Sequence, residues 1–312
     1  MSNQSRIIEV ILVGFPSLSP TFFPLVSTAL FLVYIMSLFA NGTVISLIVL
    51  KEQLQKPMYV VIGILSASDL LFDTITLPKI IARYWFGAAT MSFVGCLFQV
   101  FWVHQLGTMD AFIIMLMAID RYVAIHRPLR YSSIISNKRL GNACIIFVFL
   151  TSLAPLYAAL SDSTISYCGR VRINSCFCTN IVVHALSCDD ISFQKYLSFA
   201  LALFLLLTPL AFIIFSYIII LAMIHSSGNG QKAFYTCTTH ILVIAVYYIP
   251  RLFAYTADLM PVKPNADINV LLLCLYTFMP HVANPIIYCL RTKEIKQTLR
   301  SILEKYLTTR VN

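Results

Sequence analysis

The sequence predicts an all-α protein, a bundle of seven transmembrane helices followed by a short amphipathic eighth helix on the cytoplasmic side. Of its 312 residues, 59% are apolar and only 11% are charged. A soluble domain carries about 25% charged residues, so this chain belongs in a membrane. Seven apolar runs are long enough to cross a bilayer, which takes about 20 residues. They cover roughly 22–50, 57–82, 92–125, 140–161, 193–224, 234–258 and 268–290.

The distribution of Lys and Arg between the runs predicts the orientation. On one side, acids such as Asp162, Asp189 and Asp190 offset the few basic residues, whereas the other side keeps a basic excess. The basic side is expected to be cytoplasmic, which places the N-terminus outside the plasma membrane. The basic residues of that side are Lys51, Lys56, Arg127, Arg130, Lys138, Arg139, Lys232, Arg291, Lys293, Lys296, Arg300, Lys305 and Arg310. The chain then divides into an extracellular tail (1–21), a seven-helix domain (22–290) and a cytoplasmic helix and tail (291–312).

The connections between the runs argue against a nucleic-acid-binding protein and against an enzyme. The net charge is +9, but the basic residues lie between apolar runs and form no single face for nucleic acid. The largest loop, about 162–192, has no room for a catalytic domain. No Gly-rich phosphate loop, nucleophile elbow or His-Glu-x-x-His motif occurs, so we expect no enzyme.

The first 20 residues do not resemble a cleaved signal peptide, because no basic segment precedes a short apolar core. Asn3-Gln4-Ser5 forms a glycosylation sequon on this tail. Asn41-Gly42-Thr43 fits the same pattern but lies inside an apolar run, out of reach. The expected glycosylation site is therefore Asn3.

The segment after the seventh run has the pattern of a helix lying on a membrane surface. Its apolar residues recur at helical spacing with basic residues between them, which suits the headgroup layer of the inner leaflet. The apolar residues are Ile295, Leu299, Ile302, Leu303 and Tyr306. Membrane lipid is the expected partner. Beyond the lipid, a tail helix with no partner and a helix that makes a signalling contact are equally compatible with the pattern.

An acid and a base stand side by side at the cytoplasmic end of the third run. Charged residues at such a place are costly in lipid and need a reason. Asp120 and Arg121 can pair with each other or with neighbouring helices, and Arg121 can be released to a partner. The alternative is that Arg121 merely anchors the helix end.

Two further acids, Asp69 in the second run and Asp110 in the third, lie near the middle of their helices. Two carboxylates at similar depth can share a cation such as Na⁺, or share a proton. Alternatively, each is neutral and hydrogen-bonded to a hydroxyl such as Ser66 or Thr108. The paired arrangement is the hypothesis we favour, with Na⁺ as the only metal ion expected.

One stripe on the outer half of the third run contains His104 as its only titratable residue. The other members are Val103, Gly107, Thr108 and Ala111. His104, Gly107 and Thr108 are candidate ligand contacts, although a lone His is more often a satisfied core residue.

Arg251 follows Pro250 in an otherwise apolar part of the sixth run. It can pair with Asp258, extend to the outer surface, or face a cavity and attract an anion. Tyr255, one turn further on, can line the same cavity. Arg251 and Tyr255 therefore complete the candidate ligand site.

Nine cysteines occur, and five of them are expected on the outer side. These are Cys96 at the start of the third run and Cys168, Cys176, Cys178 and Cys188 in the large loop. Extracellular thiols are expected to oxidise, but spacing alone leaves the pairing open. Because five is an odd number, one of these cysteines is expected to stay unpaired within this group.

Several stretches, in this order, resemble the rhodopsin-like G-protein-coupled receptors, and within them the odorant receptors. They are Asn41, Pro57-Met58-Tyr59, Leu65-Ser66-Ala67-Ser68-Asp69, Met117–Ile125, Arg127-Pro128-Leu129-Arg130-Tyr131, Ser216-Tyr217, Lys232–His240 and Asn284-Pro285-Ile286-Ile287-Tyr288. The match spans nearly the whole chain. A His at position 104 in the third run resembles the fish-like (class I) subgroup of odorant receptors. Some members of that subgroup hold a carboxylate with an Arg near the outer end of the sixth helix. That position is Leu259 here, so this contact does not carry over, and Arg251 is a possible replacement.

The resemblance implies a receptor in olfactory cilia that binds a small odorant and activates a stimulatory heterotrimeric G protein, raising cyclic AMP. It implies that Asp120, Arg121 and Tyr122 form the inner lock and G-protein contact, and that Asp69 and Asp110 form a sodium-binding region. It also implies the disulfides Cys96–Cys178 and Cys168–Cys188. The alternative is a receptor of the same subgroup that senses a small metabolite outside the nose. A light-driven opsin is excluded, because the seventh run lacks a Lys to hold retinal.

Overall fold

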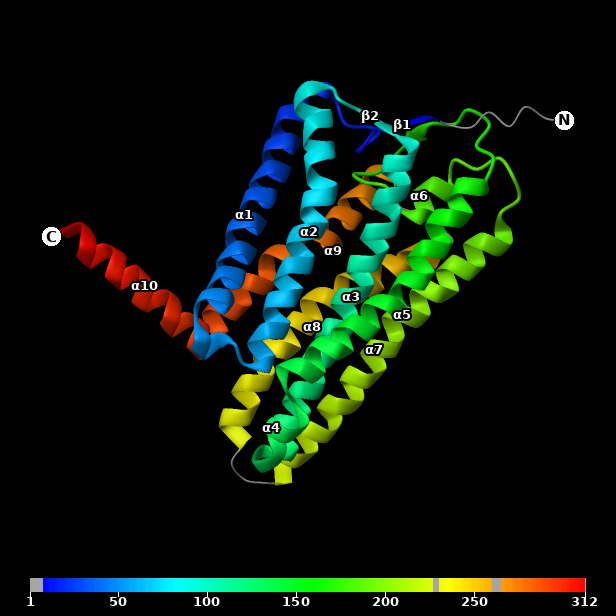
Figure 1. Cartoon of the computed structure of the whole chain (residues 1–312). Coiled ribbons are helices and arrows are strands. Elements are labelled where there is room, and N and C mark those ends of the chain that lie inside the picture. The colour runs from blue at the N-terminus through cyan, green and yellow to red at the C-terminus, as the bar shows by residue number, and fades with distance from the viewer. Residues whose placement is uncertain (1–7, 227–229, 260–264, 312) are drawn as a thin grey trace.

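Seven long helices form the bundle in the computed structural model, which describes residues 8–226, 230–259 and 265–311 (Figure 1). They are α1 (Phe23–Leu50), α2 (Pro57–Phe86), α3 (Phe93–His126), α5 (Asn137–Thr164), α7 (Ser192–Ser226), α8 (Gly230–Leu259) and α9 (Ala266–Arg291). All of them except α1 extend beyond the predicted apolar runs, by at most four residues at an end. Their end turns are more polar, so hydropathy does not detect them, although backbone hydrogen bonding continues there.

α3 is the central helix of the bundle. Six of the described helices are apolar enough by composition to cross a membrane, and α3 is the exception. It packs against α2, α5, α7 and α8, so most of its surface faces protein and not lipid. Polar residues such as Gln99, Gln105 and Asp110 are therefore buried in it.

The outward faces of the other helices carry large exposed apolar side chains. Phe149 and Leu153 on α5 and Phe204 and Phe215 on α7 are each more than 60% exposed. An apolar surface of this extent is a lipid-facing surface. Prolines lie inside several of these helices, at Pro78, Pro155, Pro209, Pro250, Pro280 and Pro285.

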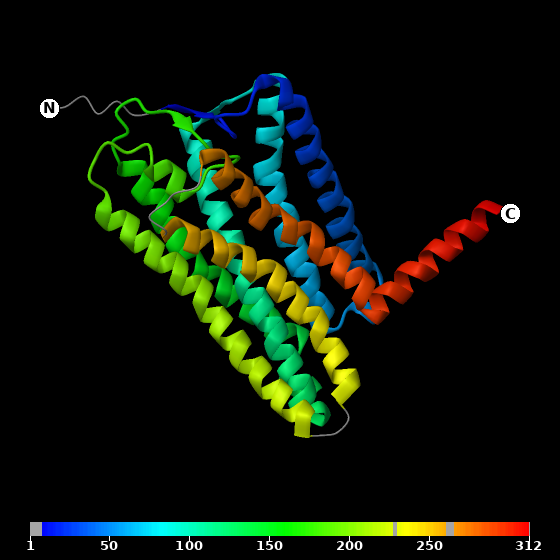
Figure 2. The same ribbon diagram turned by 180° about the vertical axis from the view of Figure 1, so that it is seen from behind.

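A small three-stranded sheet covers one end of the bundle, which the all-α prediction did not include (Figures 1 and 2). β1 (Glu9–Leu12) pairs antiparallel with β2 (Thr90–Ser92) and parallel with β3 (Arg172–Ile173). Val10 and Leu12 are fully buried beneath it. The N-terminal segment from residue 8 onward is thus part of the packed fold, because its apolar residues cover the core at this end of the bundle. The end that carries the sheet is called the outer end below, and the opposite end is called the inner end.

Gly14 then turns the chain against α2. Its φ is +74°, and a Cβ there would lie 2.1 Å from the Tyr84 hydroxyl oxygen. The neighbouring Phe15 N–H donates to that hydroxyl at 2.8 Å. Only glycine allows this approach, which fastens the start of the chain to the bundle.

Short elements and α10 (Lys293–Val311) complete the fold. The short helices are η1 (Pro20–Phe22), η2 (Glu52–Leu54), η3 (Pro128–Arg130), α4 (Tyr131–Ile134) and α6 (Asn180–His184). α10, the expected eighth helix, leaves α9 after Thr292 and points away from the bundle in both views (Figures 1 and 2). Its first turns are fixed by the buried Ile295 and by a hydrogen bond from Gln53 Nε2 to Thr298 Oγ1 at 2.9 Å.

Candidate functional site

A cavity of about 150 Å³ lies in the outer half of the bundle, between α3, α5, α7, α8 and α9. Four of the five predicted ligand residues, His104, Gly107, Thr108 and Arg251, line it. The side chain of the fifth, Tyr255, lies outside the described residues, as does the predicted glycosylation site Asn3. The structure therefore brings together residues that the sequence separates by about 140 positions.

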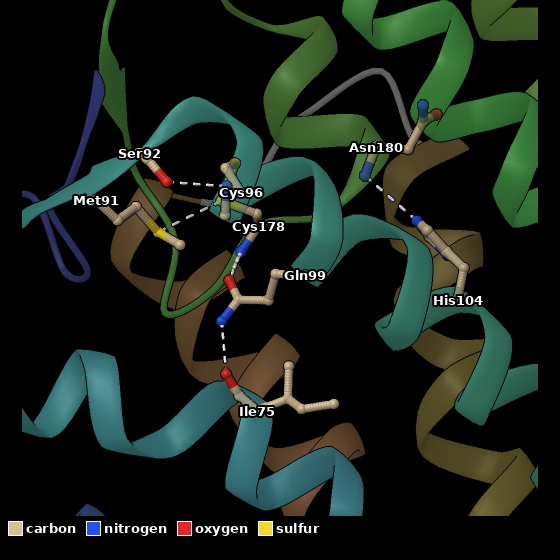
Figure 3. The surroundings of a disulfide bond; sticks show 9 residues. Ile75, Met91, Ser92, Cys96, Gln99, His104, Cys178 and Asn180 are labelled. Carbon is tan, nitrogen blue, oxygen red and sulfur yellow. Dashed lines mark hydrogen bonds between the residues drawn. A yellow bond between two sulfur atoms is a disulfide. The ribbon is translucent and has the colours of Figure 1, made fainter. Parts of the chain in front are cut away.

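The roof of the cavity is the loop between β3 and α6, held by a disulfide from Cys96 to Cys178 (Figure 3). The Cys178 N–H donates to Gln99 Oε1 at 2.7 Å, and Gln99 Nε2 donates to the Ile75 carbonyl at 2.9 Å. A second disulfide, Cys168–Cys188, closes the rest of the loop. Both pairs implied by the resemblance are thus present in the structure.

His104 faces the roof and connects it to α3. Its Nε2 accepts a hydrogen bond from the Asn180 N–H at 3.3 Å (Figure 3). Asn180 Nδ2 in turn donates to both oxygens of Asp162, and His184 Nε2 lies 2.8 Å from the same carboxylate. The His104 ring therefore occupies the edge of a buried polar network that includes an acid.

Arg251 is 8% exposed and lines the cavity. Its Nη1 donates to the Tyr247 carbonyl at 3.2 Å, and its guanidinium lies 3.8 Å from the centroid of the Tyr247 ring. Among the described side chains, no carboxylate forms an ion pair with it. Of the three predicted alternatives, extension to the outer surface is wrong because the side chain is buried. The side chain of Asp258, the carboxylate with which Arg251 was predicted to pair, lies outside the described side chains.

The two acids in the middle of the bundle face one site, as the paired hypothesis requires. One ligand atom each from Asp69, Asp110 and His281 lies within 4.8 Å of the others. Ser68 Oγ donates to Asp110 at 2.6 Å, so Ser68 takes the place that was suggested for Ser66 or Thr108. Asn284 Nδ2 donates to Asp69 at 3.3 Å.

His281 and Asp73 complete this cluster, and sequence reasoning missed both. His281 Nδ1 lies 2.7 Å from Asp73 Oδ1, and its Nε2 lies 3.5 Å from Asp69 Oδ1. All three side chains are 1% exposed. The available signals were a His in an apolar run and an acid four residues after Asp69, on the same helical face.

The residues present offer oxygen donors that suit Na⁺. Besides the carboxylates of Asp69 and Asp110, the buried Ser66 Oγ and Asn284 Oδ1 have no hydrogen-bond partner. Buried polar atoms of this kind require a partner such as water or an ion. His281 Nε2 is also buried and without a hydrogen-bond partner, so one side of the cluster presents a nitrogen atom.

At the inner end, the Asp120-Arg121 pair contacts two different neighbours. Tyr131 Oη donates to Asp120 Oδ1 at 2.6 Å, and Arg121 Nε donates to His240 Nε2 on α8 at 3.2 Å. Burial, together with the bond to Asp120, raises the pKa of Tyr131, so this phenol remains a donor. Tyr122 stacks on His126. Arg121 therefore joins α3 to α8.

The fold defined by these helices is that of the rhodopsin-like receptors. The structure of squid rhodopsin matches this one with a TM-score of 0.67, covering 94% of this chain and 88% of that chain, at 16% sequence identity.

Sequence comparison identifies the family within this class. The model of the family described as olfactory receptor matches residues 30–306. Human olfactory receptor 56A5 is 34% identical over 307 residues, which are 97% of this chain and 98% of that protein. Human olfactory receptor 2M2 is 35% identical over 308 residues, 97% of this chain and 87% of that protein. The chain belongs to the olfactory receptor family: it is a multi-pass membrane receptor and not an enzyme. Its place in the fish-like subgroup stays a prediction.

We expect His281→Ala to destabilise the receptor by about 3–5 kcal/mol, because Asp73 would lose its buried imidazole partner and keep the hydrogen bond from Ser37 Oγ. The thermal midpoint of the purified receptor should fall, whereas His126→Ala, which removes an exposed imidazole from the inner end of α3, serves as the control. Equal midpoints for the two variants would show that the Asp73–His281 contact contributes nothing to stability.

Proposed function

We propose that the receptor binds a small anionic odorant in the outer cavity and activates a stimulatory heterotrimeric G protein, which raises cyclic AMP. The observation that carries the ligand class is Arg251, a buried cation that lines the cavity and has no carboxylate partner among the described side chains. A buried charge is costly unless it is paired. A ligand carboxylate would supply that pair.

The remaining walls of the cavity favour a short apolar body. Leu205, Leu206, Val103 and Phe177 line it together with the side chains already named. Small-molecule sites commonly combine an apolar lining with a few convergent polar groups. Arg251 and His104 would fix the polar end of the ligand while the apolar walls select its shape.

α8 connects the ligand cavity to the inner lock. Tyr247 Oη donates to the Gly107 carbonyl of α3 at 2.5 Å, beside the cavity. Two turns before Tyr247 on α8, toward the inner end, His240 Nε2 accepts the hydrogen bond from Arg121. Pro250 lies in α8 next to Arg251 and interrupts its hydrogen bonding. A ligand that holds Arg251 in another position would shift the helix and favour the state in which Arg121 is released.

The cluster in the middle of the bundle is a candidate sodium site. Asp69 and Asp110 would hold Na⁺, and Asn284 and Ser66 would add oxygen atoms. The ion would supply positive charge between the two carboxylates. Because these residues come from α2, α3 and α9, a bound cation would favour the present arrangement of those helices.

The two ends of the bundle support an extracellular N-terminus. Both disulfides lie at the end that carries β1, and disulfides persist in oxidising surroundings. The opposite end carries the excess of Lys and Arg, as expected for the cytoplasmic side. We place the receptor in the plasma membrane of olfactory cilia on this basis and on its family.

Arg251→Ala should raise the half-maximal concentration of short-chain carboxylates by roughly 10- to 100-fold, because charge-assisted hydrogen bonds contribute about 1.5–3 kcal/mol. The measurement is cyclic AMP in heterologous cells, with alcohols of the same chain length in parallel. Arg83→Ala is the matched control, since this arginine lies on α2 and outside the cavity lining. Unchanged responses to every acid would refute the anionic ligand class.

Arg121→Ala should abolish ligand-stimulated cyclic AMP while leaving surface expression intact, because the proposed G-protein contact is removed. His240→Ala should instead raise basal cyclic AMP, since it removes the partner that holds Arg121. Arg139→Ala, an exposed arginine at the start of α5, controls for loss of inner positive charge. Wild-type signalling by Arg121→Ala would disprove the lock.

Replacing external sodium with choline should lower the half-maximal ligand concentration of the wild-type receptor, because a cation that favours the present helix arrangement is removed. Asp110→Asn should lose this dependence, and Asp190→Asn in the exposed loop should keep it. A sodium effect of equal size in Asp110→Asn would place the ion elsewhere.

A further inference from the structure

Cys176 and Cys274 are unassigned by the family resemblance, yet they meet in the structure. Their Sγ atoms are 3.0 Å apart. Cys176 belongs to the loop that roofs the cavity and is fully buried, and Cys274 lies on α9 and is 9% exposed. Both thiols are free, in contrast to the four cysteines in the two disulfides.

The separation of the two sulfur atoms is close to that of a bond. A disulfide holds its sulfur atoms about 2 Å apart, so closure requires an approach of only about 1 Å. Loop side chains can make an adjustment of this size more readily than two helices can. The partners are also far apart in the sequence, so a bond between them would close a long loop of the unfolded chain.

The chemical surroundings at this end of the molecule favour oxidation. Cys176 is two residues from Cys178, which is bonded to Cys96. Cys168 and Cys188 of the same loop are bonded to each other. The loop therefore folds where thiols oxidise, and Cys176 is exposed to the same oxidants before the loop packs.

We propose that Cys176 and Cys274 form a third disulfide, which ties the roof of the cavity to α9. The reaction is thiol–disulfide exchange with a disulfide-bearing oxidant, either an oxidoreductase or a small-molecule disulfide. The two thiols lose two protons and two electrons and form one S–S bond. The oxidant's S–S bond breaks, and it takes up the electrons and protons as two thiols.

Burial determines when this bond forms. The contact with the Cys274 thiol and burial raise the pKa of Cys176 well above its usual value. Since the thiolate is the reacting species, the packed pair is slow to react. Oxidation therefore takes place during folding, or when the loop opens.

The third disulfide would fix the residue between the two bonded cysteines. Phe177 is fully buried, lines the cavity and packs edge-on against Phe72 and Phe278. With Cys178 tied to α3 and Cys176 tied to α9, the Phe177 backbone would be held from both sides. The roof would then be preorganised over the ligand, which lowers the entropy lost on binding.

Counting thiols in the full-length receptor tests the bond directly. The receptor is denatured without reductant and labelled with a maleimide, and the number of adducts is determined by mass spectrometry of the intact protein. Nine cysteines occur, and five are free if only the two disulfides exist. We expect three adducts on the wild type, whereas five adducts would overturn the proposal.

Single substitutions change the count in opposite directions under the two outcomes. If the third disulfide forms, Cys176→Ser or Cys274→Ser frees the partner and raises the count by one. If it does not form, either substitution lowers the count by one. Cys289→Ser, a free cysteine further along α9, lowers the count by one in both cases and controls the labelling.

Peptide mapping of the unreduced wild type provides the second measurement. A fragment joining Cys176 to Cys274 supports the proposal, and a fragment joining Cys176 to Cys96 contradicts it. The wild-type measurements remain decisive even if a variant fails to fold. Because the readout is chemical, it stands or falls independently of the proposed ligand.

Discussion

Each polar side chain inside this bundle needs a partner within the protein, because the hydrocarbon around the helices offers none. α3 meets this constraint at three depths. Near the outer end, Gln99 bridges the loop backbone and α2. In the middle, Asp110 accepts a hydrogen bond from Ser68. At the inner end, Asp120 and Arg121 are bound by Tyr131 and His240. The central position of α3 follows from this need for partners on several sides.

The same constraint explains how an event in the cavity can reach the inner end. Tyr247 and His240 lie on α8 and contact α3 at two places, the Gly107 carbonyl and Arg121. Moving α8 breaks buried hydrogen bonds unless new partners replace them, so intermediate positions are unfavourable. A bundle held in this way tends to have two arrangements and not a continuum. Ligand binding and G-protein binding can then act on one equilibrium.

Features that depend on residues close together in the sequence could be predicted. Apolar runs revealed the long helices, and the stretch around Asp120-Arg121 revealed the family. The contacts of His281 with Asp73, and of Asp162 with Asn180 and His184, were not predicted. Each joins residues from different elements, so it depends on the depth and rotation of those elements, which hydropathy does not fix. β1 was missed because its strand partners lie about 80 and 160 residues away.

The depth of Arg251 in the bundle limits the size of the proposed ligand more than the charge of Arg251 does. Leu259 occupies the place near the outer end of the sixth helix where some relatives are expected to carry an arginine. Eight residues of helix correspond to about 12 Å, so the cation of this receptor lies much deeper. At that depth Tyr247 covers one face of the guanidinium and supplies a carbonyl, which replaces part of its hydration. A carboxylate paired with Arg251, as proposed, would share a cavity of about 150 Å³ with Phe177 and His104. If the ligand is the proposed anion, this depth favours short acids, because a long chain attached to a carboxylate at Arg251 would collide with the roof.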